Sequence, residues 1–281
     1  MISPSGTRFD YVTIGHVTCD EIEHGTGSGS FQPGGSAFYS ALQAARLGLR
    51  TLILTQGVPN EIEALLEPYL GELELCVIPA EQTTRLSTRG AGAERTQHML
   101  AWAGPIVEPV ELDTAILHVA PVARETPVCF RGKADFLGVT PQGLIRHWGQ
   151  GEEVSLRELD ATLLPRSFDA AVISEHERES CHSLFSAARR SGAPVAVTAG
   201  SGPTTVYVQA SANESIEQVQ PPPVAVRDDL GAGDVFAAAF FLALADGHTS
   251  IQAAAFGNAA AAIRIAGSGP GAIGRPATIT P

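Results

Sequence analysis

The sequence is poor in positive charge, and this shortage excludes several classes of partner. Only 18 of its 281 residues are Lys or Arg, against 30 Asp or Glu, so the formal net charge is −12. Phosphate backbones and anionic lipid surfaces repel a chain of this charge, so we expect neither nucleic acid nor a membrane as its main partner. The balance still permits a local basic pocket for the phosphates of a small molecule.

Cysteines and long apolar runs are also scarce. The four cysteines, Cys19, Cys76, Cys129 and Cys181, have no paired spacing, so neither a zinc site nor a disulfide framework is predicted. Reduced small core residues are the simpler interpretation. The longest apolar run, residues 236–245, is too short to cross a bilayer, and the first residues lack the apolar segment of a signal peptide. We therefore expect a cytoplasmic protein.

The most informative stretch is residues 228–236, Asp-Asp-Leu-Gly-Ala-Gly-Asp-Val-Phe. An apolar segment, 235–245, follows and is long enough for about three turns of buried helix. The glycines therefore lie at a loop-to-helix junction, where unpaired N–H groups attract an anion. Asp234 places a proton acceptor beside that anion, which suits phosphoryl transfer to an alcohol. An ordinary turn with a capping Asp would show the same residues, so the motif needs a matching context.

Strand-like and helical segments alternate along much of the chain. Strands are predicted at 11–15, 51–55, 115–120, 136–140, 170–173, 194–198 and 205–208, and helices at 36–47, 175–191, 235–245 and 253–266. This alternation predicts an α/β fold with a largely parallel sheet, helices on both faces, and ligands at the carboxyl ends of the strands. Residues 84–102 have a turn at 90–93 and predict a β-hairpin.

The pattern Asp-x-x-Gly-Ala-Gly-Asp-x-Phe resembles the signature of the ribokinase-like (PfkB) carbohydrate kinases, and Gly34-Gly35 before a helix that ends in Ala-Arg-Leu-Gly resembles a second family pattern. The resemblance extends in order over nearly the whole chain. It implies one ribokinase-like α/β domain, residues 1–281, with a central mostly parallel sheet and a small β lid from segments at about 18–33 and 82–106. It also implies transfer of the γ-phosphate of ATP, with Mg²⁺, to a hydroxyl of a sugar, polyol or nucleoside.

The same resemblance implies roles for individual residues. Asp234 would be the catalytic base, and the backbone of Gly231, Ala232 and Gly233 would stabilise the transferring phosphoryl group. The residues expected to hold the acceptor are Asp20, Gly34, Gly35, Tyr39, Arg95 and Gln142. The two acceptor oxygens of Asp20 suit a diol, whereas Arg95 fits a solvated hairpin position equally well.

The donor side is expected after the later strands. Thr198 and Gly200 match the nucleotide-phosphate pattern Thr-x-Gly-x-x-Gly, whose last glycine is missing here, with Gly202 close to its place. The resemblance places Asn258 on a helix beside the adenine and gives Glu177 the task of organising Mg²⁺ through water. A solvated acid at a helix start is the alternative for Glu177.

Three positions depart from the family pattern: Tyr39 and Ser174 stand where Asn is common, and Asp229 stands where Thr is usual. They argue against ribose as the substrate, while residues 95–97 and 174–177 resemble the myo-inositol kinase branch. Ser174 and Tyr39 also favour an alternative, a nucleotide- or sugar-binding sensor without turnover. A monomer and a homodimer both fit the sequence, as does a monovalent cation beside ATP and Mg²⁺.

Overall fold

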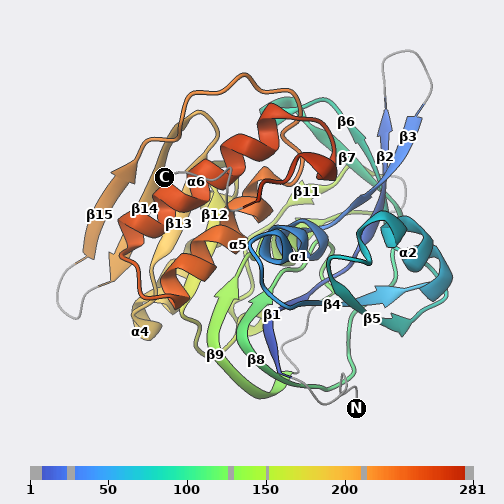
Figure 1. Ribbon diagram of the computed structural model, residues 1–281, viewed down its shortest axis with the longest axis horizontal. Helices are drawn as coiled ribbons and strands as arrows, with labels where there is room; N and C mark the ends of the chain where they lie inside the picture. The colour runs from blue at the N-terminus through green and yellow to red at the C-terminus, as the bar shows by residue number, and fades with distance from the viewer. Residues whose placement is uncertain (1–7, 24–28, 126–129, 150–151, 210–213, 276–281) are drawn as a thin grey trace.

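A nine-stranded sheet forms the centre of the molecule (Figure 1). The computed structural model describes residues 8–23, 29–125, 130–149, 152–209 and 214–275, and the structural statements below concern these residues. The strands run in the order β15-β14-β13-β12-β9-β8-β1-β4-β5. Their bounds are β1 Phe9–Ile14, β4 Thr51–Gly57, β5 Glu74–Pro79, β8 Val110–Val119, β9 Phe130–Val139, β12 Ala170–Ser174, β13 Val195–Ala199, β14 Gly202–Gln209 and β15 Glu214–Val219. Neighbours from β5 to β13 are parallel, and β14 and β15 add antiparallel strands at one edge.

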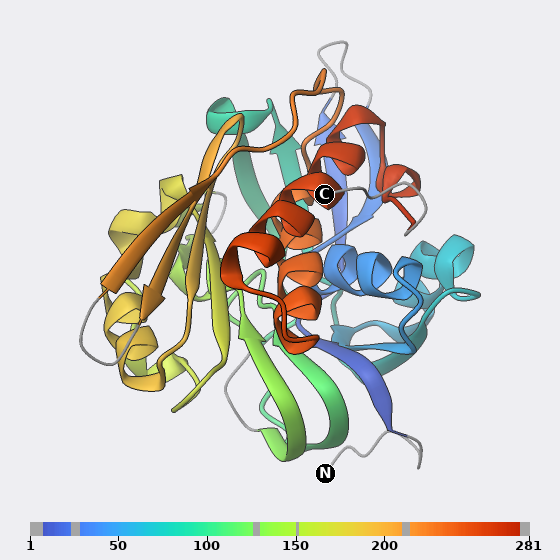
Figure 2. The ribbon, with the colours of Figure 1, turned by 60° about the vertical axis from the view of Figure 1, so that its left-hand side comes forward.

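Helices cover both faces of this sheet (Figure 2). One face carries α1 Ser36–Arg46, α2 Pro59–Leu66, α5 Ala232–Ala245 and α6 Ser250–Ala266, and the other carries α3 Gln142–Ile145 and α4 His182–Ser191. Successive side chains of a strand point to opposite faces, so Tyr11 of β1 packs towards α1 and α5 while Val12 and Ile14 belong to the core of the other face. The predicted α/β class, with a mostly parallel sheet between two helical layers, is confirmed.

A second, smaller sheet lies beyond the carboxyl end of β1. It has the order β3-β2-β6-β7, with β2 Thr18–Glu23, β3 Gly29–Gly34, β6 Arg85–Arg89 and β7 Thr96–Ala101. The 3₁₀ helix η2, Gly92–Glu94, closes the turn between β6 and β7. The predicted hairpin and small β lid are therefore confirmed, although residues 24–28 of the lid segment lie outside the described residues. The single domain over 1–281 stays a prediction.

The remaining elements are short. A two-stranded ladder joins β10 Arg146–His147 to β11 Ser155–Leu156, and four further 3₁₀ helices are η1 Glu67–Tyr69, η3 Ala161–Leu163, η4 Glu175–Cys181 and η5 Pro270–Ala272. Among the described residues, none of the helices combines the length and the hydropathy that a membrane span requires. Of the cysteines expected in the core, Cys181 is buried, Cys19 and Cys76 are partly exposed, and Cys129 lies outside the described residues.

Two elements differ from the prediction. The helix expected at 175–191 begins as the 3₁₀ helix η4, and α4 starts only at His182. Glu175 and Glu179 would face each other one turn apart in an α-helix, where like charges repel. The strand expected at 205–208 is antiparallel to its neighbour, because only two residues connect β13 to β14 and a parallel crossover needs a dozen or more. Strands β5 and β15 and helix α2 have no counterpart among the predicted elements.

Helix α5 lies unusually close to β9. Phe241 of α5 is fully buried, and a Cβ atom added at Gly138 of β9 would lie 2.4 Å from its ring. The glycine therefore sets the distance between the central helix and the sheet, and with it the place at which α5 begins.

Replacing Gly138 with Ala should lower the free energy of unfolding by about 1–3 kcal/mol, because the added methyl overpacks the core. Denaturant unfolding measures the change. The matched control is Gly71→Ala, since Gly71 is exposed with no atom within 4 Å of an added Cβ, and it should stay within about 0.5 kcal/mol of the parent. Equal effects of the two substitutions would contradict the close helix–sheet contact.

Candidate active site

The start of α5 has the geometry predicted for an anion site. Gly231 is the N-cap and has a left-handed backbone, with φ of 76°, which glycine adopts without a steric penalty. The Ala232 N–H donates to the carbonyl oxygen of Asp229 at 3.2 Å, so that amide is already engaged. Gly233 is exposed and belongs to the first turn, where N–H groups have no partner within the helix.

The ring of Tyr39 packs against the glycine turn at Gly231. Its side chain is 1% exposed, and a Cβ atom at Gly231 would lie 2.3 Å from its ring. The guanidinium of Arg264 lies 5.6 Å from the centre of the same ring. The ring therefore packs against the glycine turn, and its predicted contact with the acceptor stays a prediction.

Asp234 is half-buried in the first turn of α5 and is held by α1. The Ser36 hydroxyl donates to Asp234 Oδ1, and the Ser40 hydroxyl donates to the Asp234 carbonyl oxygen at 3.1 Å. Burial raises the pKa of Asp234 to about 6, against the opposing effects of the Ser36 hydrogen bond and of Arg146. A carboxylate with a pKa near the working pH is a suitable general base.

Asp20, on β2, supplies a second buried carboxylate. It is 3% exposed, and the Thr18 hydroxyl donates to its Oδ1 at 2.6 Å. A Cβ atom at Gly34 would lie 2.1 Å from Asp20 Oδ2, and one at Gly35 would lie 2.2 Å from the His16 carbonyl oxygen. The glycine pair therefore makes room for the carboxylate as well as for any ligand. Burial raises the pKa of Asp20 to about 6, and Thr18, Arg146 and Arg95 oppose that rise.

Arg146 is the main residue that sequence reasoning missed. It follows α3, donates from Nη2 to Gln97 Oε1 at 2.9 Å and from Nη1 to the Val122 carbonyl oxygen at 3.0 Å. Burial lowers its pKa, and four carboxylates oppose this. In order of effect they are Glu177, Asp20, Asp234 and Glu125. The positive charge thus lies among acids from four separate segments. Gln142, four residues earlier, was predicted at the site, but the spacing around it does not show that the Arg146 side chain turns inward.

Gln142, predicted as an acceptor contact, is half-buried at the start of α3 in the same segment. Glu125 is fully buried and was also missed. Its carboxylate accepts the N–H groups of His16, Val122 and Ala123 at 2.8, 2.7 and 2.6 Å. It therefore ties the loop after β1 to the loop after β8, below Arg146.

Arg95 and Asp229 connect the lid to the glycine loop. Arg95 forms an ion pair with Asp229 Oδ1, and the Gly92 N–H donates to Asp229 Oδ2 at 2.8 Å. The guanidinium of Arg95 therefore contacts the loop before α5, and its contact with the acceptor stays a prediction. The same contact gives a structural account of Asp229, the position where the family pattern has Thr.

The residues predicted to bind the phosphoryl donor lie in two separate places. Thr198 ends β13 with its hydroxyl 3.4 Å from the Ile173 carbonyl oxygen, and Gly200, with φ of 58°, forms a two-residue turn before Gly202. Asn258 is elsewhere: it is 5% exposed, accepts from the Thr204 hydroxyl at 2.8 Å and donates to the Val219 carbonyl oxygen at 3.1 Å. Its amide oxygen and nitrogen therefore join α6 to β14 and β15, and its contact with a nucleotide stays a prediction.

Glu177 lies beside the cluster. It is 7% exposed, and its Oε2 accepts the Ser174 N–H at 2.8 Å in a capping box. Its charge acts on both Arg146 and Asp234. Within the described ranges, no three His, Cys, Asp or Glu side chains come close enough together to hold a metal ion.

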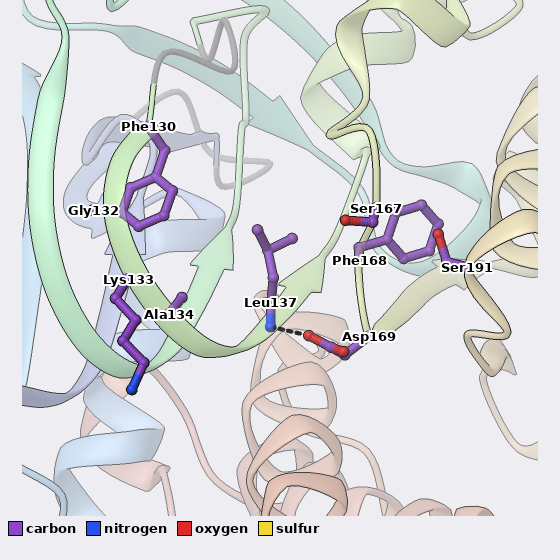
Figure 3. A pocket seen from close by; sticks show the side chains of 9 residues that line it. All are labelled: Phe130, Gly132, Lys133, Ala134, Leu137, Ser167, Phe168, Asp169 and Ser191. Carbon is purple, nitrogen blue, oxygen red and sulfur yellow. Dashed lines mark hydrogen bonds between the residues drawn. The ribbon is translucent and has the colours of Figure 1, made fainter.

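A hollow of about 340 Å³ lies at the other end of the sheet (Figure 3). Its walls include Phe130 and Lys133, at the start of β9, and Phe168 and Asp169, just before β12. Asp169 Oδ2 accepts the Leu137 N–H at 2.7 Å. Ligands of parallel sheets bind at the carboxyl ends of strands, and the acids, Arg146 and the glycine turn meet there, so this hollow is separate from the candidate site.

Comparison with known proteins agrees with this geometry. Residues 158–277 match the sequence model of the pfkB family carbohydrate kinase. No curated protein matches the chain in sequence. One similar solved structure is a pyrophosphate-dependent kinase in the ribokinase family complexed with a pyrophosphate analog and myo-inositol. It is 18% identical, with a TM-score of 0.72 over 91% of this chain and 94% of that chain.

Two ribokinases share the fold to a similar degree. The enzyme from Thermotoga maritima is 18% identical, with a TM-score of 0.70 over 96% of this chain and 98% of that chain. The Arabidopsis thaliana enzyme, complexed with ribose and ATP, is 18% identical, with a TM-score of 0.68 over 97% and 98%. These likenesses establish the ribokinase-like fold that the sequence predicts.

The two buried acids should make stability depend on pH. The folded-state pKa of Asp20, about 6, exceeds the ordinary value of 3.8, so its contribution to stability is present below pH 3.8 and is lost as the pH rises through 6. Asp20→Asn removes this dependence. We compare the unfolding free energy of Asp20→Asn with that of the wild type. From pH 3.5 to pH 7.5, the variant should gain stability relative to the wild type by up to about 3 kcal/mol.

Denaturant unfolding across this pH range measures the difference. Asp160→Asn is the opposite-sign control, because the hydroxyl and the N–H of Thr162 hold the pKa of the exposed Asp160 carboxyl below its usual range. A flat difference for Asp20→Asn would contradict the raised pKa of Asp20.

Proposed function

Because residues 158–277 match the pfkB family carbohydrate kinase model and the fold is ribokinase-like, we propose that the chain is a phosphotransferase that transfers a phosphoryl group to a hydroxyl of a sugar, an inositol-like polyol or a nucleoside. One observation carries the proposal: Asp234, with a pKa of about 6, stands in the first turn of α5 beside the glycine turn. A proton acceptor and a place for an anion therefore occur together at one helix start.

In the proposed step, the acceptor hydroxyl gives its proton to Asp234 Oδ2, because Oδ1 is engaged by Ser36. The hydroxyl oxygen forms the new bond to phosphorus as the bond from phosphorus to the leaving phosphate oxygen breaks, and that oxygen keeps the electron pair. The amides of the first turn of α5, Gly233 among them, stabilise charge on the transferring group. Arg146 keeps Asp20 and Asp234 ionised by opposing the rise in their pKa values.

Asp20 is the proposed anchor for the acceptor. Its carboxylate takes one hydrogen bond from Thr18 and keeps acceptor capacity for substrate hydroxyls. A buried acceptor of this kind rejects analogues that lack the hydroxyl, since the carboxylate would then be left unpaired. Gly34, Gly35, Arg95 and Gln142 are proposed to surround the acceptor with it.

ATP is the proposed donor, with Thr198, Gly200 and Gly202 near its phosphates. Pyrophosphate is the second candidate, because the buried Asn258 amide already binds Thr204 and Val219, and a similar structure is that of a pyrophosphate-dependent kinase. Glu177 is the proposed partner of Mg²⁺. Such an ion keeps waters and phosphate oxygens and needs only one or two protein carboxylates, which the single carboxylate of Glu177 fits. When bound, it would neutralise charge on the donor phosphates.

Replacing Asp234 with Asn should lower kcat by roughly 10²–10⁴, the usual size of a general-base contribution, with little change in donor binding. The matched control is Asp246→Asn, the same substitution at the exposed end of the same helix, which should keep wild-type turnover. Wild-type turnover in Asp234→Asn would remove Asp234 from its role.

The substrate assay combines two donors, ATP and pyrophosphate, with a panel of sugars, polyols and nucleosides, and measures the phosphorylated product directly. We expect product with one donor and a narrow set of acceptors. A shift of the melting temperature with donor or acceptor, without product in any combination, would instead support the non-catalytic sensor.

A further inference from the structure

His118 is a buried titratable group that the proposed step does not use. It lies on β8, is 0% exposed, and its ring meets that of Phe241 on α5 edge-on, with centroids 4.9 Å apart. Burial lowers the pKa of His118 to about 3, so the ring is neutral at physiological pH. A neutral imidazole has one donor and one acceptor nitrogen, and both need partners inside a protein.

Both nitrogens of His118 have such partners, and these lead to Asp234. Nδ1 lies 2.9 Å from the Tyr11 hydroxyl, and Nε2 lies 2.9 Å from the Thr140 hydroxyl. The Thr140 hydroxyl lies 3.5 Å from the hydroxyl of Ser36, the longest link, and Ser36 donates to Asp234 Oδ1. We call Tyr11, His118, Thr140 and Ser36 the polar chain. It runs from β1 through β8 and the end of β9 to the first residue of α1.

The direction of every proton in the polar chain follows from counting donors. An ionised carboxylate can only accept hydrogen bonds, so the Ser36 hydroxyl donates its one hydrogen bond to Asp234. Ser36 can then only accept from Thr140, and Thr140 can only accept from Nε2–H of His118. The acceptor that remains, Nδ1, takes the proton of Tyr11. All four donors therefore point towards the carboxylate.

We propose that His118 and Thr140 are positioning residues that orient the Ser36 hydroxyl, and so hold Asp234 in one rotamer with Oδ2 free for the acceptor proton. The inference rests on the proposed function for the role of Asp234. Burying an aligned row of dipoles against a charge strengthens each hydrogen bond in turn, whereas apolar side chains of the same size would fill this part of the core without orienting Ser36.

The other groups that act on Asp234 come from different segments. Arg146 attracts its negative charge, and Glu177 and Asp20 repel it. Tyr11 stays protonated, because burial and the nearby Asp234 both raise its pKa. The polar chain is uncharged, and it is therefore distinct from the charged residues that act on the Asp234 carboxylate.

Thr140→Val tests the proposal, because it keeps the shape of the side chain and removes the link between His118 and Ser36. We expect kcat to fall about threefold to tenfold, the value of one or two neutral hydrogen bonds, with KM unchanged. The acidic limb of the kcat–pH profile should move up by about half a unit, since a carboxylate with fewer oriented donors is easier to protonate.

Two variants separate positioning from stability. Thr13 pairs in register with His118 on the neighbouring strand, is buried, and its hydroxyl has no hydrogen-bond partner within the described part of the chain. Thr13→Val therefore makes the same chemical change beside the polar chain without breaking it, and should leave kcat and its pH profile unchanged. Thr140→Ser keeps the hydroxyl and should restore both. If Thr140→Val behaves like Thr13→Val, the proposal is overturned.

The ¹⁵N resonances of His118 give a readout that needs no turnover. We expect a neutral ring protonated at Nε2 in the wild type from pH 5 to pH 8, and a changed Nε2 resonance in Thr140→Val. A ring protonated at Nδ1 would overturn the proposal even in an active enzyme. If the wild type transfers phosphate to no acceptor, the proposed function fails, and a carboxyl ¹³C titration of Asp234 in wild type and Thr140→Val still decides the inference. Should Thr140→Val not fold, Tyr11→Phe is read by the same resonances.

Discussion

The arrangement depends on one electrostatic constraint: two buried acids share one arginine close to the glycine turn before α5. Asp20 and Asp234 both have pKa values raised to about 6 by burial, and two like charges in a dry site repel each other. Arg146 offsets that repulsion, and its own position is fixed by Gln97 and the Val122 carbonyl. The loop that carries Val122 is fixed in turn by the three N–H groups bonded to Glu125. The hydrogen bonds of the charged side chains Arg146 and Glu125 therefore connect the loops after β1, β8 and β9.

Much of this organisation could be predicted from local sequence. The glycine turn and α5, the helix α1 ending before Gly48, and the hairpin of the lid each depend on residues close together in the chain. Gly48 has a φ of 96° and follows α1, as the helix-terminating glycine should. These signals are local because they arise from backbone preferences, caps and side-chain periodicity.

The residues that the sequence did not reveal are those whose partners are distant in the chain. Arg146 meets Gln97 and Asp20, and His118 meets Tyr11, so no spacing within one segment marks them. The same limit applies to contacts within the core. Tyr39 and Asn258 lie on the expected helices, but the sequence does not show that Tyr39 packs against Gly231 or that Asn258 binds Thr204 and Val219. Side-chain periodicity in the sequence predicts which helix carries a residue. It predicts less well which residues that side chain contacts.

The contacts of Asp229 with Gly92 and Arg95 join the small sheet to the loop before α5. Swinging the hairpin outward would break a partly buried ion pair and a backbone hydrogen bond, and would release the residue that stands two places before Gly231. In the proposed reaction, entry of the alcohol and the shape of the glycine turn would be coupled, because an open hairpin leaves Asp229 without these two partners.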